Sequence, residues 1–278
     1  HPRGRAIRFL TLKMMGRAMS ETVIKTAYVM TTRKRGHEGT ALGGLLRRGL
    51  KSGVEAEVVV DPGSSPYTCY REILERSAER DGDARWLLSM QDDCSAANGF
   101  LDRVNKILAH APDGLVSFYN PTNKGYRQAA ESGKHVYRTR WNFWPQCHAF
   151  PRAYISDFLE HTDENFPAHY YSDDGRIKKW LRDNKKLYVY AIVPSMTQHL
   201  GAYRSSLDIP GRCGGQVRNS FNFAPSFDVS AVDWESEFAN PFTAKDSRGF
   251  MPYDGYLRSV DGDDLSAWTG KSGEKVKK

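Results

Sequence analysis

The sequence predicts an α/β protein in which helices flank a mostly parallel β-sheet. Two patterns lead to this prediction. Apolar, strand-like segments alternate with helical segments in the first third of the chain, and polar residues follow the end of each of these strands. The composition, with 40% hydrophobic and 12% aromatic residues among 278, is sufficient for a large buried core. We therefore expect a globular protein.

The first part of the chain supplies three strand–helix units. Strands are expected at Ile24–Met30, Ala56–Val60 and Arg85–Met90. The apolar residues of the three following helices recur with helical spacing: Leu42, Leu45, Leu46 and Leu50, then Tyr70, Ile73, Leu74 and Ala78, then Leu101, Val104 and Leu108. Consecutive units of this kind favour parallel strands, because each helix returns the chain to the same edge of the sheet.

The second part of the chain is expected to be less regular. Its predicted elements are, in order, a strand at Gly114–Tyr119, a short strand at Lys134–Tyr137, an aromatic loop or strand at Trp141–Phe150, a helix near Arg152–His161, a helix that begins at Asp173 and a strand at Leu187–Val193. The Asp173 helix carries apolar residues on one face, at Ile177, Trp180 and Leu181.

The chain is expected to divide into three segments. Residues 1–21 contain four arginines and a lysine without an apolar period, so a basic N-terminal arm is expected. Residues 22–206 form the main domain. Residues 207–278 are rich in Gly, Pro, Asn and aromatic residues, which predicts an irregular extension that wraps the domain and is disordered after about Trp268.

Charge and cysteine usage restrict the partners and the compartment. The net charge of +7 favours an anionic partner such as nucleic acid, anionic lipid or a nucleotide-sugar. The four cysteines have no zinc-site spacing and are expected to be reduced thiols. The sequence contains no run of about 18 apolar residues, so it predicts no transmembrane helix. We expect a soluble, cytoplasmic protein with no integral membrane segment.

Two acidic pairs and a histidine are the candidate functional residues. Asp92-Asp93 follows an apolar strand, Asp173-Asp174 begins a helix, and His199 follows the last predicted strand. Buried carboxylates are costly unless a cation or another partner compensates them, so these residues indicate a metal-assisted site. Taken alone, the first pair is better explained by capping, with Asp93 or Ser95 capping the next helix. For the second pair, a place in the first turn of a helix is compatible with a functional role.

The order of these features resembles the GT-A family of nucleotide-sugar glycosyltransferases, particularly its family-2-like inverting enzymes. The order is a strand end with an acidic pair, an aromatic loop, an acidic pair at a helix start, a strand, and then Gln198-His199-Leu200-Gly201. The resemblance covers roughly residues 22–206. It implies a Rossmann-like GT-A sheet and transfer of a sugar from a nucleotide-sugar, most simply a UDP-sugar, to a hydroxyl group.

The resemblance also implies a metal site. Gln91-Asp92-Asp93 stands where the family has an Asp-x-Asp motif, so Asp93 would be a metal ligand and Asp92 would face the ribose or the metal. Gln91 replaces the usual first carboxylate. His199 matches the second metal ligand of the family, and the cation would be manganese or magnesium.

The remaining matches concern the base, the donor and the acceptor. The resemblance implies Asp174 as the general base, with Asp173 as a supporting or acceptor contact. It places the nucleoside against Asp61 and the Thr31-Thr32-Arg33 segment. The loop that contacts the acceptor in the family corresponds to the glycine-free segment here that carries Trp141, Trp144 and His148.

Several functions remain open. The acceptor is either a saccharide, free or lipid-linked, or a hydroxymethylated DNA base, which Trp141 and Trp144 would stack when it is flipped out of the duplex. A metal-dependent phosphoesterase or nuclease is an alternative, since paired aspartates also hold two cations. A non-catalytic module that binds nucleotide-sugars is the other alternative, and Gln91 and the glycine-free loop favour it.

Overall fold

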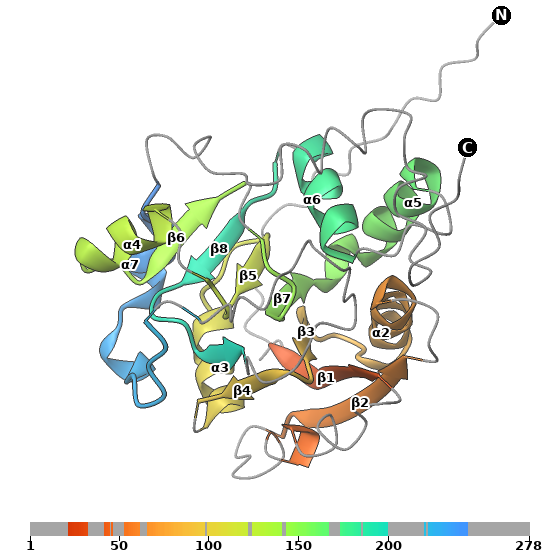
Figure 1. Cartoon of the computed structure of the whole chain (residues 1–278), viewed down its shortest axis with the longest axis horizontal. Helices are drawn as coiled ribbons and strands as arrows, with labels where there is room; N and C mark the ends of the chain where they lie inside the picture. Colours follow the sequence, from red (N-terminus) through yellow and green to blue (C-terminus); the bar gives the residue numbers. More distant parts are fainter. Residues whose placement is uncertain are drawn as a thin grey trace, which may run out of the picture.

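A seven-stranded β-sheet in the order β2-β1-β3-β7-β5-β8-β6 forms the centre of the computed structural model (Figure 1). A separate two-stranded sheet pairs β4 with β9. The structure describes residues 22–32, 42–44, 46, 53–61, 66–97, 99–121, 124–140, 143–166, 173–184, 186–199, 220 and 222–243.

The strands are β1 (Ile24–Thr32), β2 (Glu55–Asp61), β3 (Trp86–Gln91), β4 (Cys94–Ala96), β5 (Leu115–Ser117), β6 (Val136–Thr139), β7 (Cys147–Pro151), β8 (Val189–Ile192) and β9 (Thr197–His199). The α-helices are α2 (Pro66–Arg80), α3 (Phe100–Leu108), α4 (Lys124–Glu131), α5 (Ile155–Asn165), α6 (Asp173–Asp183) and α7 (Trp234–Ala239). Two short 3₁₀ turns, η2 (Arg152–Tyr154) and η3 (Val229–Ala231), precede α5 and α7.

The main sheet is mostly parallel, as the sequence predicts. Strand β1 is parallel to both β2 and β3, and β5 is parallel to β8. Strand β7 lies antiparallel between β3 and β5, and β6 lies antiparallel to β8 at one edge. Five strands therefore end at the same edge of the sheet, where Thr32 pairs with Asp61 and Met30 pairs with Gln91.

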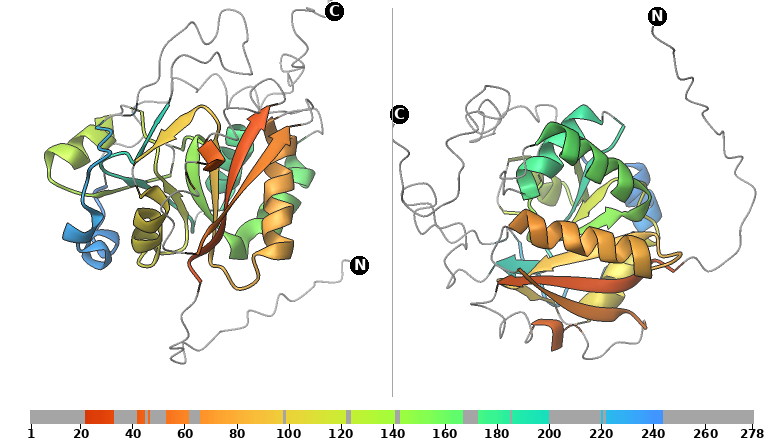
Figure 2. Two further views of the ribbon diagram at one scale, coloured as in Figure 1. Left: turned by 90° about the horizontal axis from the view of Figure 1, so that it is seen from below. Right: turned by 90° about the vertical axis from the view of Figure 1, so that its right-hand side faces the viewer.

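Side chains alternate between the two faces of the sheet because successive residues of a strand point in opposite directions. In β1, Ala27 and Val29 belong to the core that includes α3 and α7, whereas Tyr28 and Met30 belong to the core that includes α2, α5 and α6. Figure 2 shows these two helical layers on opposite faces of the sheet. The expected α/β architecture with flanking helices is thus confirmed.

Three local elements differ from the expectations. Helix α4 was not predicted, because only Gly125, Tyr126 and Ala129 of its eight residues are buried and its apolar pattern is weak. Residues after Asp93 form strand β4 and not a capped helix start, since Gly99 begins α3 without a side-chain cap. Within the C-terminal extension, the described part contains η3 and the six-residue helix α7.

Residues 222–243 pack along the edge of the main sheet. Trp234 and Phe238 of α7 enter the core beside α3. The Phe242 amide donates to the Val136 carbonyl at 2.8 Å, and the Arg138 amide donates to the Phe242 carbonyl at 2.8 Å. This pairing covers part of β6 that would otherwise expose unpaired backbone groups.

Among the described helices, none is long and apolar enough to cross a bilayer.

Candidate functional site

The end of β3 is tied to the end of β1 through Asp92. The Thr31 hydroxyl donates a hydrogen bond of 2.6 Å to Oδ2 of Asp92, and the Asp92 amide donates to the Met30 carbonyl at 2.9 Å. Thr31 and Asp92 are both buried. The two adjacent parallel strands thus hold the first acidic pair in a fixed position, at the edge of the sheet where ligands of open α/β folds bind.

Asp93 and His199 are brought together by the two-stranded sheet. Strands β4 and β9 pair so that Cys94 lies opposite His199, and Nε2 of His199 lies 3.4 Å from Oδ2 of Asp93. The Asp93 side chain is 7% exposed and the His199 side chain 18%. Nδ1 of His199 is buried and accepts or donates no hydrogen bond among the described residues. A carboxylate oxygen and an imidazole nitrogen therefore face each other near the surface.

Residues outside the sheet also hold β9. The amides of Met196 and Thr197 both donate to the Phe118 carbonyl, at 3.0 and 3.3 Å. Ser220 binds on the other side: its hydroxyl donates to the Thr197 carbonyl, and its amide donates to Oε1 of Gln198 at 3.0 Å. The backbone that carries His199 is thus fixed from two directions. The Tyr119 ring lies 6.2 Å from the imidazole.

The second acidic pair begins α6, and its two carboxylates have different surroundings. The Asp174 amide donates to Oδ1 of Asp173 at 2.7 Å, while Oδ2 of Asp173 is buried without a hydrogen-bond partner among the described residues. Burial, and then the negative charge of Asp174, raise the pKa of Asp173 to about 7. Oδ2 of Asp174 forms an ion pair of 2.9 Å with Nζ of Lys178, which lies one helical turn later.

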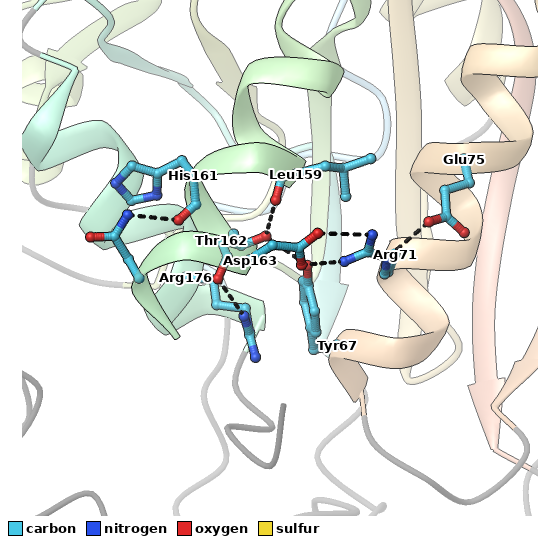
Figure 3. Close-up of polar contacts among 9 residues, drawn as sticks. Tyr67, Arg71, Glu75, Leu159, His161, Thr162, Asp163 and Arg176 are labelled. Carbon is cyan, nitrogen blue, oxygen red and sulfur yellow. Dashed lines mark hydrogen bonds and ion pairs between the residues drawn. The ribbon is translucent and has the colours of Figure 1, made fainter. Parts of the chain in front are cut away.

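Polar contacts among α2, α5 and α6 position the start of α6. In Figure 3, Arg71 of α2 donates to both carboxylate oxygens of Asp163 on α5, and the Tyr67 hydroxyl is 2.8 Å from that of Thr162. Arg176 of α6 donates to the Thr162 carbonyl at 3.3 Å, and its guanidinium carbon lies 3.8 Å from the centre of the Tyr67 ring. Arg176 is buried and lies three residues after Asp173, so these contacts fix the helix end that presents the acidic pair.

A turn at residues 143–146 contacts neighbours of both acidic pairs. Its Gln146 carbonyl accepts hydrogen bonds from the Gln91 amide at 2.8 Å and from Sγ of Cys94 at 3.6 Å. Trp144 of the same turn lies under Lys178, whose Nζ is 5.4 Å from the ring centre. The turn thus joins the residues on either side of Asp92-Asp93 to the lysine that pairs with Asp174.

Asp61, at the end of β2, and Asp173 both lie near the Cys69 thiol. Burial is the main cause that raises the pKa of the Cys69 thiol to about 12, and the charges of Asp61 and Asp173 add to it. Both carboxylates therefore act on one thiol. Asp61 is buried at the strand end.

His148 does not face a ligand-accessible surface. It is fully buried in β7, with Nε2 2.8 Å from the Tyr70 hydroxyl and Nδ1 3.2 Å from the Pro145 carbonyl. Burial lowers the pKa of His148 to about 4, so the ring is neutral at neutral pH. The expectation that His148 contacts an acceptor is corrected on this ground: the residue packs beneath the turn that carries Trp144.

The other expected site residues divide into two groups. Thr32 and Gln91 end their strands and are half-buried. Arg33 and Trp141 lie outside the described residues.

The sequence reading missed Lys178, although its spacing of four residues from Asp174 is a signal that could have identified it. No sequence signal pointed to Ser220, because its partners on β9 lie 22 and 23 residues earlier, outside any local pattern.

The described side chains fit a divalent cation only in part. Among these residues, no group of three or more histidines, cysteines, aspartates or glutamates is arranged to hold a metal ion. Asp93 and His199 offer one oxygen and one nitrogen. Manganese and magnesium accept such ligands together with phosphate oxygens and water, so a cation here would need a bound phosphate to complete its coordination.

The comparisons with known proteins give distant structural similarity. No family model matches the chain, and no curated protein matches it. A Drosophila beta-1,4-galactosyltransferase 7 mutant, solved with manganese, UDP-Gal and xylobiose, is 14% identical with a TM-score of 0.41, over 64% of this chain and 71% of that one. The catalytic domain of the same Drosophila enzyme with xylobiose is 15% identical with a TM-score of 0.38, over the same shares. Mannose-1-phosphate geranyltransferase from Thermus thermophilus is 9% identical with a TM-score of 0.33, over 61% and 74%.

Proposed function

We propose that the chain is a metal-dependent, inverting glycosyltransferase that moves a sugar from a nucleotide-sugar, a UDP-sugar in the simplest case, to a hydroxyl acceptor. The observation that carries this proposal is the Asp93–His199 pair at the end of β3, 3.4 Å apart and held by the β4–β9 sheet. Residues 22–206 would be the catalytic domain. The described part of residues 207–278 packs on this domain through α7.

The donor end of the site would be built on the ends of β1, β2 and β3. Asp93 and His199 would hold a manganese or magnesium ion together with the donor diphosphate. When bound, such a cation stabilises the negative charge that develops on the departing nucleoside diphosphate. Asp92, fixed by Thr31, and Asp61 would bind the nucleoside, with Thr32, Arg33 and Gln91 around it.

The acceptor end would lie at the start of α6. An attacking hydroxyl becomes an adequate nucleophile only as its proton is removed, so a carboxylate has to reach that proton. Asp174 is our candidate base, because its carboxylate stays partly exposed while its ion pair with Lys178 holds it in place. Asp173 would support it through the Asp174 amide, to which its Oδ1 is bonded.

A saccharide hydroxyl is the acceptor that this arrangement favours. Trp144 offers a partly exposed aromatic surface beside the Asp174–Lys178 pair, and Trp141 belongs to the same segment. A flipped DNA base would need an open ring face for stacking, and Lys178 covers one face of Trp144. The two-metal phosphoesterase alternative needs additional carboxylates, and no suitable cluster exists among the described residues.

A screen of nucleotide-sugars with manganese tests the proposal. We expect slow release of sugar from one donor without an acceptor, and transfer when a saccharide is added. Asp93→Asn should abolish both activities, Asp174→Asn should abolish transfer, and Asp83→Asn at an exposed turn is the matched control. Donor binding by calorimetry without turnover in any mixture would instead show a binding module, and release of phosphate without a sugar donor would show a phosphoesterase.

A further inference from the structure

Two arginines share one tyrosine ring at the edge of the main sheet. The guanidinium carbon of Arg138 lies 4.8 Å from the centre of the Tyr188 ring, and that of Arg140 lies 4.5 Å from it. Arg140 also donates a hydrogen bond of 2.8 Å to the Tyr188 hydroxyl. All three side chains are half-buried. We call this group the Tyr188 cluster.

Within the described part of the chain, no carboxylate forms an ion pair with the Tyr188 cluster. Neither arginine forms an ion pair among the described residues, and Nε of Arg138 is buried without a hydrogen-bond partner there. The carboxylate of Asp113 acts on Tyr190 but is paired with Arg85 at 3.3 Å. Two guanidinium groups held against one ring repel each other, so an anion between them would be stabilised.

The Tyr188 cluster lies away from the candidate active site. Thr139 pairs with Val189, the first residue of β8, and β8 runs in the same direction as β3. Arg138, Arg140 and Tyr188 therefore lie near the opposite ends of the parallel strands from Asp92-Asp93. The cluster is built from β6, the terminal strand of the sheet in Figure 1, from the residue that follows β6 and from the residue that precedes β8.

We propose that the Tyr188 cluster binds a phosphodiester group of a nucleic-acid backbone. Guanidinium groups match phosphate oxygens through pairs of parallel hydrogen bonds, and the stacked tyrosine holds both groups in place before binding. The net charge of +7 favours association with such a polyanion. A membrane surface fits less well, because docking there usually includes exposed apolar side chains, and Val60 on the far edge strand β2 is the exposed large one among the described residues.

The salt dependence of binding to a fluorescein-labelled DNA duplex tests this proposal. Each phosphate contact adds about 0.9 to the slope of log Kd against log salt concentration. Arg138→Gln with Arg140→Gln removes both partners of the one phosphate and should therefore lower the slope by about 0.9. The matched control, Lys25→Gln with Arg80→Gln, removes two charges elsewhere, where Lys25 binds the Arg80 carbonyl. This double control should retain the wild-type slope.

Two further measurements keep the test decisive. Arg140→Gln alone, which leaves β6 unchanged, should also lower the slope, by at most about 0.9, even if the double variant is unstable. Asp93→Asn should bind DNA as the wild type does, because the cluster is independent of the proposed sugar transfer. An unchanged slope in both arginine variants would overturn the proposal, as would arginine-dependent binding to phosphatidylserine vesicles without binding to DNA.

Discussion

Nε2 of His199 lies 3.4 Å from Oδ2 of Asp93, although the two residues stand on segments far apart in the sequence. Their approach depends on the register of two three-residue strands, in which Cys94 is opposite His199. Asp93 is buried and His199 is half-buried, and Asp93 follows the end of β3, beside the end of β1. A pair of this kind binds a cation better than either residue alone, since one ion is shared by two preplaced ligands.

Metal binding can be measured without any sugar transfer. We expect Asp93→Asn and His199→Gln each to weaken manganese binding by about tenfold or more, because each removes one of two protein ligands. Calorimetry with manganese in the presence of UDP gives the affinity. His110→Gln, at an exposed histidine, should leave it unchanged. Wild-type affinity in both site variants would exclude this pair as the metal site.

The raised pKa of Asp173 predicts how stability depends on pH. Burial raises the pKa from its ordinary value of 3.8 to about 7, so between these values the folded chain holds a proton that the unfolded chain has lost. The contribution of Asp173 to the free energy of unfolding therefore falls as the pH rises through this window, by about 1.4 kcal/mol for each unit of pKa displacement.

Asp173→Asn removes that dependence. Relative to the wild type, the variant should become increasingly stable from pH 5 to about pH 7 and gain nothing further above it. Thermal or urea unfolding at several pH values measures this difference. Asp83→Asn, at an exposed turn, is the control and should show no comparable increase. A constant difference between Asp173→Asn and the wild type would contradict the buried, protonated state.

Much of the fold could be predicted because its central elements have strong local patterns. Strands β1, β2 and β3 are apolar runs followed by polar residues, and α2 and α3 repeat apolar residues with helical spacing. The elements that were missed have little local signal. Strands β4 and β9 have three residues each, and α7 has six, so their formation depends on partners elsewhere in the chain.

The candidate site could be predicted only for residues whose place at the end of a strand or helix is visible in the sequence. The acidic pairs were visible as strand and helix ends, but the register that joins Asp93 to His199 was not. His148 was expected to contact the acceptor, but all five residues of β7 are buried, and such a strand has no alternation in the sequence that would show which side chains are accessible. Its hydrogen bond with Tyr70 depends on the packing of α2 against this strand.

Lys178 should control the ionisation of the second acidic pair. Its charge lowers the pKa of Asp173 and forms an ion pair with Asp174, so Lys178→Met should move the titration of Asp173 to higher pH. NMR titration of isotope-labelled aspartate carboxyls reports the midpoint. Lys178→Arg should restore it, and Lys179→Met, whose lysine pairs with Asp183 on the same helix, should leave it in place. An unchanged midpoint in Lys178→Met would mean that the ion pair is not formed in solution.

Ser220 should act as a positioning residue for His199. Its hydroxyl binds the Thr197 carbonyl in a buried contact, so Ser220→Ala leaves that carbonyl with fewer partners and should cost about 1–3 kcal/mol in the free energy of unfolding. A purely structural role would lower the free energy of unfolding and leave manganese affinity unchanged. If the contact also fixes β9, manganese affinity should fall in the variant even at temperatures far below its melting point.

Ser230→Ala separates these two effects. Ser230 is exposed and binds Nζ of Lys106 on α3, so it also links the C-terminal extension to the domain but lies away from β9. We expect a small loss of stability and unchanged manganese affinity. Equal effects of the two serine variants on metal binding would show that the extension acts by general stabilisation. A selective effect of Ser220→Ala would show that an extension residue sets the geometry of the metal pair, because the only change is the hydroxyl bound to the strand that carries His199.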